Sequence, residues 1–213
     1  MHGLLWLRPP RRGGRVVLVQ VIAHMFMQKT LCLFEVNLKT AQLPVCTARL
    51  AVEYRPLDAA AWAVQPHTSH MVDRHLFPAR LARGEHFWTA QYRDKIVAYC
   101  WATHAPVEIG EIRRVVSPRD DEIYFYDAFT FAEYRGQNLY PALLQRILEY
   151  SRHEGLRRAL IFVMSDNAAS IRGVQKAGFR EFQRVTYSNI LGFGRYVYRP
   201  RLPAPAGVDL LPV

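Results

Sequence analysis

The stretch Asp127–Leu144, DAFTFAEYRGQNLYPALL, decides the fold of this chain. Its first part is aromatic and strand-like, and Pro141 stands where a helix begins, a place at which the missing N–H of proline costs nothing. A short loop containing Gly136 lies between the two. The backbone amides at such a helix start point outward, and the helix dipole adds partial positive charge. The stretch therefore predicts a strand, an anion-binding loop and a helix, with Arg135 as an added cation.

Hydrophobic patterns on either side of this stretch predict a mixed α/β domain. Upstream, His86–Tyr92 and Ile96–His104 are strand-like runs joined by a short polar turn, which is typical of a hairpin. Downstream, the continuous apolar run Ala159–Met164 predicts a buried strand, and Ala168–Lys176 predicts a helix that ends at a glycine. Strands that alternate with helices in this way predict a mixed sheet with helices on both faces.

Less regular patterns complete the secondary structure. The segment 105–119 is punctuated by proline and glycine and predicts an irregular edge strand or a loop over a cleft. Further strands are expected at Thr30–Val36, Ala48–Arg55, Glu122–Phe131, Phe182–Asn189 and Arg195–Tyr198, and further helices at Val16–Gln28, Asp58–Val64, Ser69–Ala82 (interrupted at Pro78) and Pro141–His153. We expect a basic N-terminal extension with a short helix and a strand over residues 1–44, one domain over 45–199, and a proline-rich tail over 200–213.

Composition and charge narrow the class of partner. The chain has 213 residues, half of them hydrophobic, which suits one packed domain with a small addition. Its formal net charge of +10 favours a phosphate-bearing partner: a nucleotide cofactor, a nucleic acid or a membrane surface. The arginines are dispersed and no recognition motif accompanies them, so we expect no specific binding of nucleic acid.

The cysteines and the N-terminus bear on the compartment. Cys32, Cys46 and Cys100 are widely spaced and form no CxxC pair, which argues against a disulfide framework and a zinc site and favours the cytoplasm. Four arginines precede the apolar run Val16–Met27, but no cleavage site follows it and it is too short to span a bilayer. A helix packed on the domain and a peripheral contact with an anionic membrane are both compatible with this run.

Two motifs together give a family resemblance. Asp127–Leu144 resembles the acyl-CoA-binding motif of the GNAT superfamily of N-acyltransferases, and the residues from Asn167 to Phe179 resemble the later helix of that family, with its Lys-x-Gly-Phe end. The resemblance implies a GNAT-like fold, with a mostly antiparallel sheet splayed at an acyl-CoA site. It implies acetyl-CoA or another acyl-CoA as the co-substrate, and no metal.

The resemblance also assigns roles to particular positions. The loop that begins with Arg135 and Gly136 would bind the CoA pyrophosphate through the backbone amides of Gln137, Asn138, Leu139 and Tyr140. The pantetheine arm would lie along the backbone of Phe129, Thr130 and Phe131, where a bulge would open the sheet, and Asn167 would lie beside the arm.

Three positions depart from the family pattern. Asn138 and Tyr140 occupy places that usually hold small residues, and Val174 stands where the family often has a tyrosine that protonates the departing thiolate. Asparagine tolerates left-handed backbone angles better than other non-glycine residues, so Asn138 is a mild change. The bulky Tyr140 must point aside or touch the ligand itself. A degenerate loop that no longer binds is the competing interpretation.

The strongest candidate for a general base is Asp127. It interrupts an aromatic strand next to the expected position of the acyl group. A structural carboxylate that anchors a nearby amide or arginine is at least as good an interpretation of Asp127. His104, Glu108 and Glu111 border the expected acceptor cleft and are weaker candidates, since solvated loop residues are common at such places.

We therefore expect an N-acyltransferase that moves an acetyl or other acyl group to an amine of a small molecule or a protein. A variant of this hypothesis uses long-chain acyl donors, as the N-acyl amino acid synthases of the same superfamily do. A non-catalytic acyl-CoA-binding or regulatory module is the alternative of a different class, favoured modestly by Val174 and Tyr140. The sequence does not choose between a monomer and a homodimer.

Overall fold

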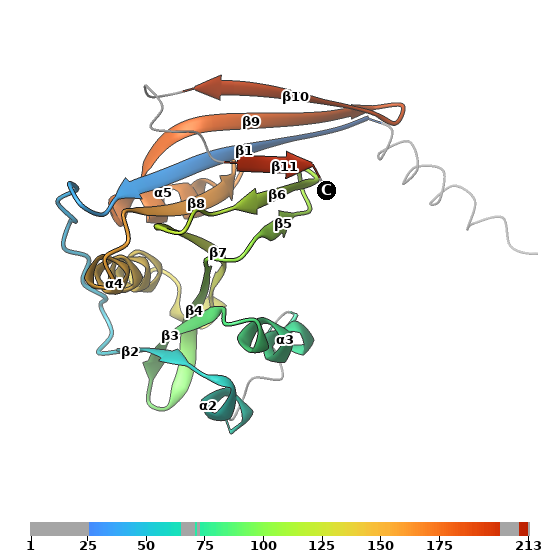
Figure 1. Cartoon of the computed structure of the whole chain (residues 1–213). Helices are drawn as coiled ribbons and strands as arrows, with labels where there is room; N and C mark the ends of the chain where they lie inside the picture. Colours follow the sequence, from blue (N-terminus) through green and yellow to red (C-terminus); the bar gives the residue numbers. More distant parts are fainter. Residues whose placement is uncertain (1–25, 65–70, 72, 201–208, 213) are drawn as a thin grey trace, which may run out of the picture.

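The computed structural model describes residues 26–64, 71, 73–200 and 209–212 (Figure 1). Within these residues an eight-stranded sheet forms the body of the molecule. Its strand order is β10 (Phe193–Pro200), β9 (Arg180–Ile190), β1 (Phe26–Asn37), β8 (Arg158–Met164), β7 (Glu122–Thr130), β4 (Lys95–Thr103), β3 (His86–Tyr92) and β2 (Glu53–Leu57). Only the β7–β8 pair is parallel, so the prediction of a mostly antiparallel mixed sheet is confirmed.

Helices cover both faces of this sheet, as the sequence predicts. They are α2 (Ala59–Ala63), α3 (Phe77–Ala82), α4 (Leu139–His153) and α5 (Ala168–Lys176), with short 3-10 turns at Arg74–Leu76 and Ala132–Tyr134. Asp58 caps α2, since its side chain accepts a hydrogen bond of 2.7 Å from the Ala61 amide. Pro78 lies in the first turn of α3, so it begins this helix and separates it from the preceding 3-10 turn.

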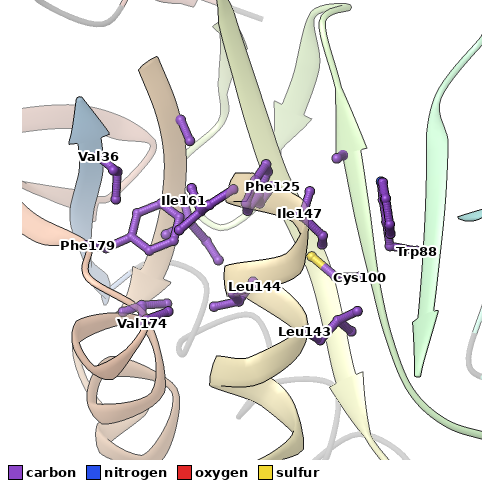
Figure 2. Packing of buried hydrophobic residues seen from close by; sticks show 14 of the residues in the cluster. Val36, Trp88, Cys100, Phe125, Leu143, Leu144, Ile147, Ile161, Val174 and Phe179 are labelled. Carbon is purple, nitrogen blue, oxygen red and sulfur yellow. The ribbon is translucent and has the colours of Figure 1, made fainter. Parts of the chain in front are cut away.

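Alternation along the strands divides the core into two faces. In β1, Cys32 and Phe34 pack toward α4 and α5, while Leu31 and Leu33 pack on the opposite face. Figure 2 shows the first of these faces, where side chains of α4 such as Leu144 meet the strands. The opposite face is covered by α2 and α3 over one half of the sheet and by a small second sheet over the other.

Two predictions for the first third of the chain differ from the structure where it is described. Of the helix expected at Val16–Gln28, residues 16–25 lie outside the described residues, and the last three belong to β1. The strand expected at Ala48–Arg55 begins only at Glu53. The preceding segment is irregular because its backbone groups bond to α4 and its loop: the Cys46 amide donates to Gln145 Oε1 at 2.6 Å, and the Arg49 amide donates to the Gln137 carbonyl at 2.9 Å.

The expected C-terminal tail also contains a strand. Strand β11 (Asp209–Pro212) pairs with β6 (Arg114–Ser117), which pairs in turn with β5 (Val107–Ile109), so the segment 105–119 forms a hairpin in a three-stranded sheet. Leu210 packs on the apolar cluster under this sheet and so helps to hold β11 in place. The basic residues before β1 lie outside the described residues, and the domain boundaries stay a prediction.

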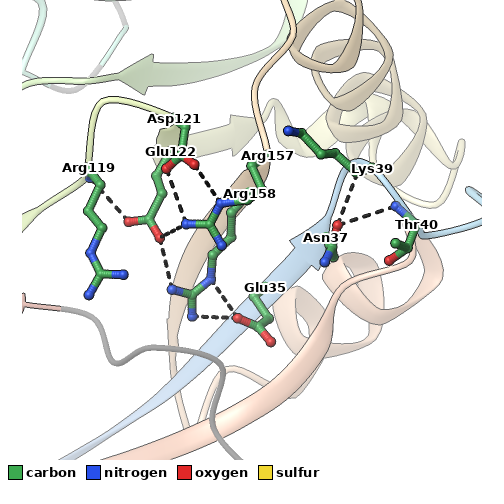
Figure 3. A network of polar contacts seen from close by, with 9 residues as sticks. All are labelled: Glu35, Asn37, Lys39, Thr40, Arg119, Asp121, Glu122, Arg157 and Arg158. Carbon is green, nitrogen blue, oxygen red and sulfur yellow. Dashed lines mark hydrogen bonds and ion pairs between the residues drawn. The ribbon is translucent and has the colours of Figure 1, made fainter.

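A buried ionic network ties three central strands together at one end (Figure 3). Arg158 of β8 pairs with Glu122 of β7, at 3.0 Å, and with Glu35 of β1. The side chains of Arg158 and Glu122 are only 4% and 1% exposed, so loss of one partner would leave a buried charge uncompensated. The network lies where β7 and β8 are paired, and it fixes their separation at that end.

Candidate functional site

A bulge in β7 shapes the centre of the site. Trp101 of β4 is opposite Tyr126, and Tyr99 is opposite Phe129, so two steps along β4 correspond to three steps along β7. The additional residue gives Asp127 a left-handed backbone, with φ of 45°. The family resemblance implied a bulge at Phe129–Phe131, and the structure has it just before these residues; such features bend a strand and interrupt its ladder.

Beyond the bulge, β7 and β8 separate. Their parallel ladder ends at the pair Phe125 and Ile161, although β7 continues to Thr130 and β8 to Met164. One edge of the later part of β7 bonds to β4, and the other faces the opening between the strands. An open strand edge of this kind can bond an extended amide-bearing ligand as an added strand would.

The loop between β7 and α4 presents backbone donors to the same opening. Asn138 adopts the left-handed backbone expected of it, with φ of 58°, and Gly136 does so with φ of 77°. In the described part of the chain, the amides of residues 137–140 donate no hydrogen bond. They stand at the N-terminus of a fifteen-residue helix, so they are suited to an anion.

Side-chain bonds explain how asparagine replaces the usual small residue at position 138. Its Nδ2 donates to the Thr47 carbonyl at 2.6 Å, and its Oδ1 accepts from Lys176 Nζ at 2.6 Å. The Asn138 side chain therefore joins the irregular segment before β2 to α5, and its left-handed backbone is held from both sides. Asparagine at position 138 departs from the family pattern but preserves the loop conformation.

Tyr140 points aside, into a space that α5 provides. A Cβ atom on Gly173 would meet Cε1 of the Tyr140 ring at 2.7 Å, so the ring lies where a side chain of residue 173 would be. The Tyr140 hydroxyl is 3.2 Å from the Ser170 hydroxyl, and burial raises the pKa of Tyr140. The absence of a side chain at Gly173 in α5 thus leaves room for the Tyr140 ring of α4. No local sequence pattern indicates this contact between the two helices.

Both sequence motifs line one open cavity of about 810 Å³. Of the predicted residues, its walls include Phe129, Thr130, Arg135, Gly136, Asn138, Leu139, Tyr140 and Asn167. Two of the predicted cofactor-binding residues lie apart from the lining. The Phe131 amide donates to the Val97 carbonyl at 3.1 Å and its ring is buried among other aromatic residues, while Gln137 is held by Arg49 through its carbonyl.

The walls of this cavity are basic. Arg49, Arg135, Arg172 and Lys176 contribute four cations, and among the described lining residues none is acidic. Sequence reasoning did not find Arg49 or Arg172. Arg172 and Lys176 are four residues apart on one helix and so share a face, a spacing that can be recognised in the sequence. Arg49 lies in the irregular segment before β2, where no sequence pattern marks it as a ligand-binding residue. A ligand with several phosphate charges fits this lining.

Two positions in α5 have structural explanations. The Asn167 side chain caps the helix by accepting from the Ser170 amide at 3.0 Å, while it also lines the cavity. Val174, at the place where a proton-donating tyrosine is often found, is fully buried in the core between α5, α4 and the sheet (Figure 2). Val174 itself supplies no acid for a leaving thiolate.

Asp127 is tied to a helix on the opposite face. Its Oδ2 accepts from Nη1 of Arg80 in α3 at 2.5 Å, and about a third of its side chain is exposed. The Arg80 guanidinium also stacks over the rings of Trp101 and Tyr126, at 5.2 and 5.1 Å from their centroids. The ion pair supports the interpretation of Asp127 as a structural carboxylate, and it leaves the role of a base without direct support.

Comparison with known proteins assigns the family. Residues 51–179, which include the bulged strand, the loop and α5, match the model of the acetyltransferase (GNAT) family. The chain belongs to this family. No curated protein matches the chain by sequence. Membership in the GNAT family supports acyl transfer in general and leaves the acceptor unidentified.

Solved structures agree with the fold of GNAT proteins. A GCN5-related N-acetyltransferase from Sphaerobacter thermophilus is 14% identical, with a TM-score of 0.53 over 86% of this chain, and this chain covers 59% of that one. An acetyltransferase of the GNAT family from Colwellia psychrerythraea is 12% identical, with a TM-score of 0.53 over 87% of this chain and 75% of its own. At these identities the likeness concerns the fold alone. Among the described helices, none is long and apolar enough to cross a membrane.

The packing of Tyr140 on Gly173 generates a test of stability. We expect Gly173→Ala to lower the free energy of unfolding by about 1–3 kcal/mol, because the new methyl group overlaps the ring. In a Tyr140→Ala background the same change should be neutral or stabilising by up to about 1 kcal/mol, because alanine is the better helix former. Urea unfolding of the four proteins measures both values. An equal effect of Gly173→Ala in the two backgrounds would contradict this packing.

Proposed function

We propose that this protein is an N-acyltransferase that moves an acetyl group from acetyl-CoA to an amine of a small molecule or a protein. The observation that carries the proposal is the cavity that joins the open edge of β7 to the donor-rich loop before α4. Its four cations suit the phosphates of CoA. A reducing compartment such as the cytoplasm is part of the proposal, because Cys46 and Cys100 are thiols without a disulfide in the described chain.

In the proposed complex the cofactor lies along three successive features. The amides of residues 137–140 bind the pyrophosphate, with Arg135 beside them. Arg172 and Lys176 from α5 add positive charge along the same wall. The pantetheine arm follows the backbone of Phe129 and Thr130, and the thioester reaches the bulge at Asp127.

The chemistry requires positioning more than a covalent intermediate. The lone pair of a neutral amine forms a bond to the thioester carbonyl carbon, and the C–S bond then breaks. The nitrogen loses one proton and the CoA sulfur gains one, so the products are an amide and a thiol. Backbone amides at the bulge are suited to stabilise the transient oxyanion. With Val174 in the core, we propose that solvent in the open cavity delivers the proton to the sulfur.

Two other functions are compatible with the same cavity. A non-catalytic acyl-CoA-binding module is favoured by the burial of Val174 and by the hydrogen bond between Tyr140 and Ser170, which engages the hydroxyl of a tyrosine that lines the cavity. Transfer of a long-chain acyl group is the other alternative. The separation of β7 from β8 gives the acyl end of a donor a path through the sheet, and chain-length dependence of turnover distinguishes this case.

Calorimetric titration with acetyl-CoA, followed by a thiol-release assay on a panel of amines, tests the proposal. We expect binding and amine-dependent release of thiol. Arg172→Gln and Lys176→Gln should each weaken binding about 10-fold, because each removes a charge-assisted contact to phosphate. Arg195→Gln removes the same charge from an exposed site on β10 and serves as the control. Binding without turnover on any amine would favour the module, and equal affinities for all variants would contradict the phosphate site.

The proposed base is tested by Asp127→Asn, with Arg80→Gln as its matched partner. If Asp127 accepts the proton from the amine, Asp127→Asn lowers kcat about 100-fold across pH. Arg80→Gln leaves the carboxylate in place and therefore lowers kcat far less. Thermal unfolding of both variants reports the loss of the ion pair separately. Near-normal kcat in Asp127→Asn would assign Asp127 a structural role and leave deprotonation of the amine to water.

A further inference from the structure

A second cavity lies on the other side of the bulge. It measures about 280 Å³ and is lined by Tyr124, Tyr126 and Asp127 of β7, while Ala128, Phe129 and Thr130 line the first cavity. The two cavities therefore adjoin on consecutive residues of one strand, at the point where β7 leaves β8. Under the proposed function a thioester at the bulge is open to an amine from this side.

The second cavity is acidic where the first is basic. The β5–β6 hairpin contributes Glu108 and Glu111, and in the part of the chain that the structure describes neither side chain makes an ion pair or a hydrogen bond. Asp127 is the third carboxylate, and Arg80 compensates its charge. None of the described lining residues is cationic. In a chain with a net charge of +10, two unpaired carboxylates at one cavity favour a cationic ligand.

A mostly buried tyrosine whose hydroxyl has no partner among the described residues supplies an independent sign of a ligand. Tyr124 is only 5% exposed and its ring stacks on that of Tyr126, with centroids 5.8 Å apart and an angle of 6° between planes. Tyr126 donates to Glu85, whereas the Tyr124 hydroxyl forms no hydrogen bond with any described residue. Burial, and then the charge of Glu111, raise the pKa of Tyr124, so it keeps its proton. The hydroxyl of this mostly buried side chain belongs to the cavity lining, where a ligand or water can complete its hydrogen bond.

The rest of the lining is apolar. Leu31 from β1, Phe162 and Met164 from β8, and Ile109 from the hairpin contribute hydrocarbon surface to the cavity. The lining thus offers polar groups from β7 and the hairpin, and apolar contact elsewhere. The volume admits a short chain of a few methylene groups and is at the lower limit for small-molecule sites.

We propose that this cavity binds a short aliphatic diamine as the acceptor, with the reacting amine at the β7 bulge and the second, charged amine at Glu108, Glu111 and the Tyr124 hydroxyl. The methylene chain between the two amines contacts the apolar lining. The inference rests on the proposed acyl transfer and adds the class of acceptor to it.

Three probes of equal length test the charge requirement. Putrescine has four methylene groups between two amines; in pentylamine a methyl group replaces the second amine, and in aminopentanoate a carboxylate replaces it. Calorimetry in the presence of CoA measures binding, and thiol release from acetyl-CoA measures kcat/KM. We expect putrescine to exceed pentylamine by at least about 10-fold in both measurements, and aminopentanoate to be the poorest.

Variants locate the preference in this cavity. Glu108→Gln and Glu111→Gln, both at exposed side chains, should reduce the advantage of putrescine over pentylamine about 10-fold, mainly through KM. Glu53→Gln removes the same charge at an exposed residue outside both cavities and should leave the advantage unchanged. Tyr124→Phe should weaken putrescine binding without loss of thermal stability, an outcome that a purely structural tyrosine would not give.

The outcomes separate this inference from the function on which it rests. Equal use of putrescine and pentylamine, or an advantage that survives both glutamine variants, overturns the diamine site and leaves acyl transfer standing. Absence of turnover on every amine, together with putrescine binding that depends on Glu108 and Glu111, overturns the enzyme and leaves the binding site standing. Preferential binding of aminopentanoate overturns the charge assignment.

Discussion

The site depends on the bulge that places Asp127 in β7. One additional residue turns the strand, ends its ladder with β8 at Phe125, and exposes the backbone of Phe129 and Thr130 at an edge inside the sheet. At the other end of the same two strands, the Arg158–Glu122 ion pair keeps them together. A buried ion pair therefore holds β7 and β8 together at one end of the opening, and at the other end the two strands are no longer paired. Left-handed backbone at a non-glycine residue is costly and is found preferentially at functional sites.

The two cavities on either side of the opening carry side chains of opposite charge. On one side of β7, four basic side chains surround the helix N-terminus, and on the other side Glu108 and Glu111 stand at a smaller cavity. This arrangement suits a reaction that brings a polyanionic donor together with a cationic acceptor at one bulged strand. The net charge of the chain does not indicate this separation of charge, because it adds the positive and negative side chains of both sides together.

Much of the fold could be predicted because local rules agree there. The apolar run of β8, the end of α5 and the hairpin β3–β4 all follow from sequence periodicity and turn residues. The predictions that are wrong concern segments whose conformation is set by distant partners. Residues 41–52 bond to α4 and its loop, Asp209–Pro212 pair with β6, and Phe26–Gln28 extend β1 beside β9.

The site shows the same division between local and distant information. The loop at Arg135–Tyr140 was predicted, and Asn138 was expected to tolerate the left-handed backbone that it adopts, because asparagine does so better than other non-glycine residues. What accommodates Tyr140 could not be predicted, since Gly173 lies on another helix and its role appears only when the two helices pack. Arg49 lines the basic cavity and Arg80 pairs with Asp127, both from segments with no motif, so only the folded chain brings them there.

Hydrogen–deuterium exchange of the loop amides tests the central claim most directly. The amides of residues 137–140 donate no hydrogen bond within the described chain, so they should exchange rapidly in the unliganded protein. With saturating acetyl-CoA we predict strong protection of these amides and of the β7 segment at Phe129 and Thr130, while the exposed hairpin tip at Leu191 stays unchanged. Unaltered exchange in the loop and in β7, under conditions where calorimetry shows acetyl-CoA bound, would contradict the account.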